Sequence, residues 1–138
     1  MPEFFHYKLI KRPKPLEPAK TPTIEIRLIG KNIIDFIAIV DSGSDCLIMP
    51  KNIAETLELK IGNNQKEVLG LGGKVKGTPI NVEGSIKYEH RRINMVIHTL
   101  VVDSELPILI GRKDFFERFE VTINERKRTV KLKDLGKI

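Results

Sequence analysis

The sequence predicts a mostly β, single-domain protein with a closed, barrel-like sheet and one or two short helices. Apolar and β-branched residues form many short runs, and turn-forming residues separate these runs, as is typical of successive strands. Only two segments have the apolar spacing of a helix, and both are short. The chain has 138 residues, of which 41% are hydrophobic, enough for the core of one domain.

The first 22 residues are predicted to form an extended, proline-rich arm ahead of a folded domain at residues 23–138. Within the arm, residues 4–10 have the composition of a short strand. Residues 12–18 are predicted to be a basic connector that lies along the surface or wraps a partner, because prolines lack the backbone donor that a sheet requires.

The domain is predicted to begin with a hairpin. Residues 23–29 alternate with period two, residues 30–32 favour a turn, and residues 33–40 return as a more apolar strand. A short helix follows at residues 50–57, where a proline lies near the first turn. Residues 67–77 are rich in glycine and indicate a loop or a hairpin tip.

The rest of the chain is predicted to contain more strands, a second short helix and a closing hairpin. The expected segments are strands at 80–88 and 93–102, an apolar stretch at 106–111, a helix at 112–119, and hairpin strands at 120–123 and 129–132 around a turn at 124–126. Short strands in this number indicate a barrel-like architecture.

The net charge of +6 permits contact with nucleic acid or an acidic surface. The basic residues are nevertheless spread along the chain, with the densest patches at 8–14 and 126–133, and aromatic residues make up only 6%. Solvated faces and loop ends therefore explain the charge better than a nucleic-acid site does, and no nucleic-acid partner is expected.

Cys46 is the single cysteine, so no disulfide can form within the chain. Neither Cys46 nor the three histidines have metal-ligand spacing, and a buried thiol is the expected state of Cys46. The longest apolar stretch, residues 33–40, contains Asp35, and we find no signal peptide or membrane span. These observations predict a cytoplasmic protein without a metal and without a membrane partner.

The triplet Asp41-Ser42-Gly43 is the most informative motif, because it directly follows the apolar run at residues 36–40. A buried strand that ends in a carboxylate, a hydroxyl and a glycine can hold an acid at the floor of a cleft. An aspartic protease uses such an acid together with a second one to activate water. The alternative is that Asp41 is a turn or cap residue.

Three segments, in order, resemble parts of the retropepsin-like aspartic protease family. Residues 36–45 resemble its catalytic loop, and residues 68–73, Val-Leu-Gly-Leu-Gly-Gly, are similar to the glycine-rich flap of its retroviral members. Residues 107–116 resemble the apolar-apolar-Gly segment and the helix that pass behind the catalytic loop. The likeness extends from about residue 23 to residue 132.

The resemblance implies a homodimer in which each subunit gives one aspartate to a central cleft covered by two flaps. The substrate implied is an extended polypeptide that pairs with the cleft like a strand, and no cofactor is implied. Because the chain has one convincing copy of the motif, the second aspartate is expected from another subunit.

The resemblance also implies roles for the residues of the loop. Asp41 is the catalytic residue, Gly43 allows the sharp turn, and the hydroxyl of Ser42 bonds across the dimer to the opposite loop. Ser44 is expected to donate to the outer oxygen of Asp41, which stabilises the anion. The alternative for Ser44 is that of a small turn residue.

The resemblance also implies an ion pair of Asp45 and Arg112 beside the dimer interface, and the preference of arginine for bidentate pairing with carboxylates favours it. The alternative is a pair of independent solvated charges. The segment behind the loop comprises Leu109, Ile110 and Gly111, and the flap comprises Leu69, Gly70, Leu71, Gly72 and Gly73. Glycines at a hairpin tip permit a hinge motion, and the alternative is a static glycine turn.

The sequence therefore predicts a dimeric aspartic endopeptidase. Two alternatives remain: a non-catalytic dimeric module of the same fold that binds peptides or acts as a scaffold, and a basic nucleic-acid-binding β-barrel. The intact Asp-Ser-Gly-Ser run favours the enzyme over the scaffold, because a binding module has no need of acids that are costly to bury in pairs.

Overall fold

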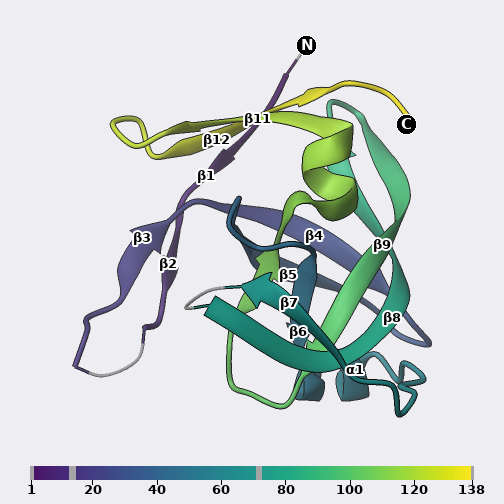
Figure 1. Ribbon diagram of the computed structural model, residues 1–138. Helices are drawn as coiled ribbons and strands as arrows, with labels where there is room; N and C mark the ends of the chain where they lie inside the picture. The colour runs from purple at the N-terminus through teal and green to yellow at the C-terminus, as the bar shows by residue number, and fades with distance from the viewer. Residues whose placement is uncertain (1, 13–14, 71–72, 138) are drawn as a thin grey trace.

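The computed structural model describes residues 2–12, 15–70 and 73–137, and it consists mostly of strands (Figure 1). Among these residues, no helix has the length and apolar character needed to cross a membrane. The elements in chain order are β1 (Glu3–His6), β2 (Lys8–Ile10), β3 (Ala19–Thr21), β4 (Thr23–Ile29), β5 (Ile33–Val40), β6 (Leu47–Pro50), α1 (Lys51–Thr56), β7 (Lys66–Gly70), β8 (Gly73–Tyr88), β9 (Arg91–Val102), β10 (Ile108–Ile110), η1 (Arg112–Phe116), β11 (Phe119–Asn124) and β12 (Thr129–Asp134).

The main sheet has the strand order β4-β5-β10-β6-β9-β8-β7, and a further pairing of β4 with β8 joins its two sides into a ring. Strand β10 lies between β5 and β6, parallel to the first and antiparallel to the second. All three residues of β10 are buried, as expected for an apolar strand with neighbours on both edges. The ring therefore places β10 directly behind the loop that connects β5 to β6.

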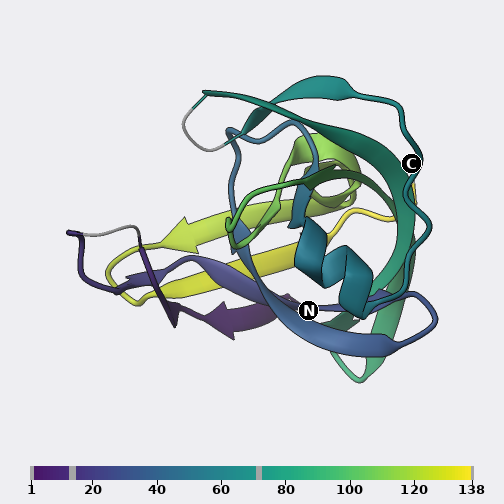
Figure 2. The same cartoon turned by 90° about the horizontal axis from the view of Figure 1, so that it is seen from below.

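Two smaller sheets extend from the ring. Strands β1, β12 and β11 form a three-stranded antiparallel sheet, and β2 and β3 form a separate hairpin. Figure 2 shows that the β2–β3 hairpin and the β11–β12 turn project on the same side of the molecule. The rings of Tyr88 and Phe119 stack with centroids 6.1 Å apart, which ties the small sheet to β8.

The core consists of two clusters of buried apolar residues. The larger cluster fills the ring and extends below the three-stranded sheet. The smaller cluster packs strand β7 against β6, β9 and β10, and its buried members are Cys46, Ile48, Val68, Leu100, Val102 and Leu109. The loop after β5 is thus supported by apolar packing on the β10 side.

Most of the predicted elements are present. The first predicted hairpin matches β4 and β5 residue for residue, and the predicted helix at 50–57 contains α1. The strand predicted at residues 4–10 corresponds to β1 and β2, whereas β3 and β6 are new. The expectation of an extended stretch at residues 13 and 14 concerns residues outside those described.

The second predicted helix is present, but it ends one residue earlier than predicted and is kinked at its start. Helical turns cover only Arg112–Phe116 and residues 117–118, and β11 already begins at Phe119. Lys113 has an extended ψ of 132°, and Asp114 has a positive φ of 68°, so the backbone is kinked there. The apolar spacing of Phe115, Phe116 and Phe119 reflects core packing, with Phe115 and Phe119 fully buried and their ring centroids 5.5 Å apart.

Candidate active site

The loop after β5 holds Asp41 by its backbone and by one side-chain oxygen. The amide of Asp41 donates to the carbonyl of Ile110 at 3.0 Å, and its carbonyl accepts from the amide of Ser44 at 3.1 Å. The oxygen Oδ1 accepts from the amide of Gly43 at 2.9 Å. The carboxyl group is therefore held in one orientation by the turn that its own triplet forms.

The other oxygen, Asp41 Oδ2, is buried and has no hydrogen-bond partner among the residues that the structure describes. A buried polar atom without a partner costs free energy, and such atoms in a native protein call for an explanation. The hydroxyl of Ser42 lies on an exposed residue and has no partner within the described part of the subunit either. The loop thus presents one exposed hydroxyl at the surface of the chain and holds one buried acidic oxygen that has no partner among the described residues.

The structure corrects the contact expected of Ser44. Its hydroxyl donates to the carbonyl of Cys46 at 2.7 Å and not to Asp41. A serine hydroxyl has a single proton to donate, and Ser44 is fully buried with the Cys46 carbonyl two residues away. Ser44 therefore supports the loop by fixing its backbone beyond the triplet.

The segment behind the loop is in close contact with it through Gly111. A Cβ atom at this position would lie 2.4 Å from the carbonyl oxygen of Ser44 and 2.7 Å from that of Cys46, so only glycine fits. The next amide, that of Arg112, donates to the Ser44 carbonyl at 2.9 Å. Leu109 and Ile110 are fully buried in β10 beside β5.

Asp45 connects this segment to the flap strand. Its Oδ1 accepts from Arg112 Nη2 at 2.5 Å, and its Oδ2 accepts from the amide of Leu69 at 2.8 Å. The amide of Asp45 in turn donates to the carbonyl of Leu69 at 2.9 Å. The bond from the Leu69 amide, followed by that from Arg112, holds the pKa of the Asp45 carboxyl below its usual value, despite partial desolvation.

The flap region is a hairpin of β7 and β8, paired from Lys66↔Gly77 to Gly70↔Gly73. A Cβ at Gly70 would lie 2.6 Å from Ile48 Cδ1, and Gly73 has a positive φ of 119°. Gly73 therefore has a backbone reason to be glycine, whereas Gly70 leaves room for the side chains of Ile48 and Val75. Leu71 and Gly72, which the sequence places in the flap, lie outside the described residues.

The family to which the sequence matches is consistent with this geometry. The family model described as retroviral aspartyl protease matches residues 18–124, which is more than half of the chain. The chain belongs to the retroviral aspartyl protease family. This finding confirms the resemblance on which the sequence prediction was based.

One solved structure supports the family at the level of the fold. A retropepsin-like aspartic protease from Rickettsia conorii is 22% identical, with 80% of this chain and 89% of that chain covered and a TM-score of 0.56. The retroviral protease-like domain of Ddi1 from Leishmania major is 15% identical, with 87% and 99% covered and a TM-score of 0.48. No curated protein matches the sequence significantly.

In this member of the retroviral aspartyl protease family, two contacts near the site had no signal in the sequence. One is the pair of hydrogen bonds between Asp45 and Leu69, which are 24 residues apart. The other is the contact of His98 with Asp114, whose Oδ2 accepts from the His98 amide at 2.6 Å and lies 3.0 Å from His98 Nδ1. Both depend on which strands the fold brings together.

The remaining candidate groups do not add chemistry to the site. Burial, together with the nearby charge of Asp45, raises the pKa of the Cys46 thiol, which makes it a poor nucleophile. Within the described ranges, no group of three or more His, Cys, Asp or Glu residues is placed to hold a metal ion. Asp41 is therefore the candidate catalytic residue of this site.

Proposed function

We propose that this chain is an aspartic endopeptidase whose active unit is a homodimer, in which the two copies of Asp41 together activate water. The observation that carries the proposal is the buried, unpartnered Asp41 Oδ2 at the end of β5. This oxygen is covered by the chain's own atoms, so a second carboxyl group supplies the missing partner, by sharing a proton, only when those atoms move aside as two copies meet. Membership of the retroviral aspartyl protease family supports the same assignment.

The chemistry follows from two carboxyl groups at hydrogen-bonding distance. Both cannot ionise cheaply, so the pair retains one proton over a broad pH range. The ionised carboxyl takes a proton from water while the protonated one polarises the scissile carbonyl, and neither a metal nor a cofactor is required. The extended substrate is held by strand-like pairing between the loop and the flap hairpin.

The supporting residues have roles in this proposal that match their contacts. Ser42, exposed and unpartnered in the described subunit, bonds to the opposite loop across the dimer. Asp45 and Arg112 brace the loop against the flap strand through Leu69. The flap glycines allow the hairpin to open for the substrate and to close over it.

The proposal is tested by incubating the protein with casein or with insulin chains between about pH 4 and pH 7, with and without a pepstatin-like inhibitor. We expect cleavage that the inhibitor blocks. Asp41→Asn is expected to abolish cleavage while the circular dichroism spectrum and the sedimentation coefficient stay unchanged. An Asp41→Asn variant that retains full activity would refute the assignment.

A further inference from the structure

Three hairpins project on one side of the molecule, and each is rich in lysine and arginine. They are the arm of residues 8–21 with β2 and β3, the flap hairpin of residues 66–77, and the β11–β12 turn of residues 125–128. In Figures 1 and 2 the arm, the β11–β12 turn and the free ends of β7 and β8 all lie on this side. We refer to these three segments as the basic hairpins.

The basic hairpins concentrate the positive charge of the chain. They contain 11 of its 24 lysines and arginines but only three of its 18 aspartates and glutamates. The rest of the chain has 13 basic and 15 acidic residues and is therefore slightly acidic. The net charge of +6 is thus concentrated in these three segments, although the sequence alone shows basic residues spread along the chain.

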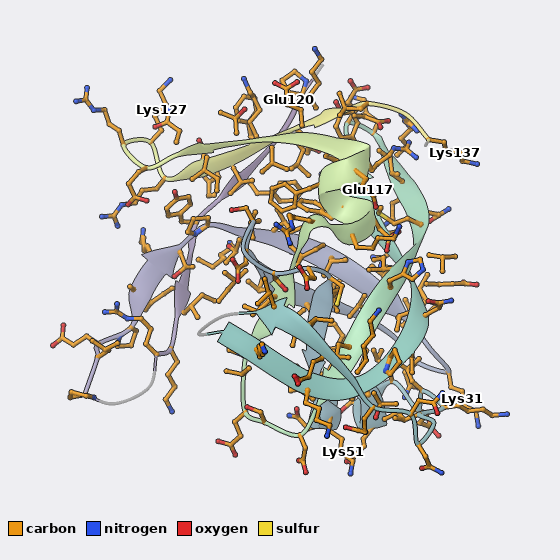
Figure 3. The ribbon with its side chains drawn as sticks, viewed as in Figure 1. Lys31, Lys51, Glu117, Glu120, Lys127 and Lys137 are labelled. Atoms are coloured by element: carbon orange, nitrogen blue, oxygen red, sulfur yellow. The ribbon has the colours of Figure 1, made fainter. Side chains whose placement is uncertain are left out.

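The described cations of the basic hairpins are exposed, and none of them forms an ion pair with another described residue. Lys8, Lys11 and Lys20 of the arm are exposed and form no ion pair within the described residues. Elsewhere on the surface, by contrast, Arg27 pairs with Asp35 at 2.8 Å. Figure 3 shows the side chain of Lys127 extending from the β11–β12 turn into solvent.

The basic hairpins are attached next to the proposed catalytic residue. The arm joins the ring at Pro22, whose carbonyl accepts from the amide of Val40 at 2.9 Å, one residue before Asp41. The flap hairpin is attached to the catalytic loop through the bonds between Leu69 and Asp45. Two of the basic hairpins are therefore attached to segments that hold the loop after β5, and the charge of Lys66 acts on Asp45.

We propose that the basic hairpins select polypeptide substrates that carry acidic residues on either side of the cleaved bond. This inference rests on the proposed function, since it concerns the substrate of the same site. Exposed cations beside a cleft raise the local concentration of an anionic substrate and orient it. The arm also exposes Leu9 and Leu16, which give an acidic peptide an apolar contact next to the cations.

An acidic polypeptide fits the basic hairpins better than a single-stranded nucleic acid does. None of the three segments contains an aromatic residue. Proteins that bind single strands stack bases on aromatic side chains between basic groups, and the basic hairpins have no such platform. Opposite charge and extended pairing, which an acidic peptide supplies, are the interactions that these segments offer.

The test compares two peptides with the same cleaved core, taken from the casein digest, whose flanks are glutamates in one and glutamines in the other. At about 50 mM NaCl we expect kcat/KM to be about tenfold higher for the glutamate peptide, and this ratio should fall toward one at about 500 mM NaCl. The double variant Lys11→Glu with Lys20→Glu should remove the preference at low salt. The matched control is Lys31→Glu with Lys137→Glu, two exposed lysines on the opposite side of the molecule in Figure 3, and it should keep the ratio.

Failure of this inference is distinct from failure of the proposed function. If the protein cleaves both peptides with equal kcat/KM, or if the arm variant keeps the preference, the inference is wrong and the protease assignment stands. If neither peptide nor casein is cleaved, the inference is tested without catalysis. Fluorescence anisotropy of the labelled glutamate peptide then measures whether the wild-type protein binds an acidic peptide. Displacement of that peptide by an equal concentration of oligothymidylate of the same length would overturn the choice of a polypeptide partner.

Discussion

At the scale of single residues, Gly111 determines how closely β10 approaches the catalytic loop. We predict that Gly111→Ala lowers the free energy of unfolding by about 1–3 kcal/mol, because the added methyl group would overlap two backbone carbonyls that cannot rotate away. Urea denaturation followed by circular dichroism measures the loss. Gly62→Ala is the control, since a Cβ at Gly62 has open space around it. Equal stability of the two variants would contradict the close approach.

The residue scale also shows what local sequence could indicate. The order of strand, triplet and apolar-apolar-Gly segment pointed to Asp41, to Gly111 and to the contact of Asp45 with Arg112, which the structure contains. The partner of the Ser44 hydroxyl was not predictable in the same way. A serine in a turn has several acceptors within reach, and only the backbone path decides that Cys46 receives the bond.

At the scale of elements, Asp134 at the end of β12 fastens the three-stranded sheet to the ring. Its Oδ1 accepts from Arg118 Nε at 2.5 Å, and its amide donates to the hydroxyl of Tyr88 in β8 at 3.0 Å. The hydrogen bond from Arg118 is the largest of the effects that hold the pKa of the Asp134 carboxyl below its ordinary value of 3.8, against the opposing effect of burial. The attachment of the three-stranded sheet to the ring thus depends on the ionised state of the Asp134 carboxyl.

The pH dependence of this link gives the second prediction. A carboxyl whose pKa is lowered by folding stabilises the protein above its unfolded pKa, and this contribution is lost as the pH falls through the folded pKa. Asp134→Asn should therefore lower the melting temperature at pH 7, and the difference from the wild type should shrink as the pH falls below about 3.8. Thermal unfolding followed by circular dichroism measures both. A difference that stays constant down to pH 2 would rule out ionisation as its cause; Asp103→Asn, on an exposed loop, is the control.

Strands were predictable where the alternation of apolar and polar residues continued over enough positions to be recognised. The seven residues of β4 and the eight of β5 give a clear pattern, and both were predicted with their correct ends. The strand predicted at residues 4–10 includes β2, whereas β3 has three residues and follows a proline-rich stretch, so no period could be recognised there. In the second predicted helix, the helical spacing of the phenylalanines led to the inclusion of Phe119. This residue belongs to strand β11, and its side chain is buried in the same core.

At the scale of the whole molecule, the position of β10 between β5 and β6 is what makes the site possible. This insertion buries β10 on both edges and places Gly111 against the catalytic loop. Periodicity within a strand carries no information about its neighbours, so the resemblance to a family, and not the alternation, led to this part of the fold. The one-sided charge was hidden for the same reason, since hairpins far apart in sequence gather on one side only after folding.

The shared-site mechanism makes a quantitative prediction for mixed subunits. If each active unit needs two copies of Asp41, a heterodimer of wild type and Asp41→Asn has one ionisable acid and should be inactive. Mixing equal amounts at constant total protein, after subunit exchange, should leave about a quarter of the wild-type activity, whereas subunits that act alone would leave about a half. Initial rates on casein across a series of mixing ratios distinguish a quadratic from a linear decline.

The same series with Lys137→Glu in place of Asp41→Asn should show no decline, because Lys137 lies on the side away from the basic hairpins. A linear decline with Asp41→Asn would show that one subunit suffices, and the dimeric mechanism would have to be abandoned even if Asp41 itself proved essential.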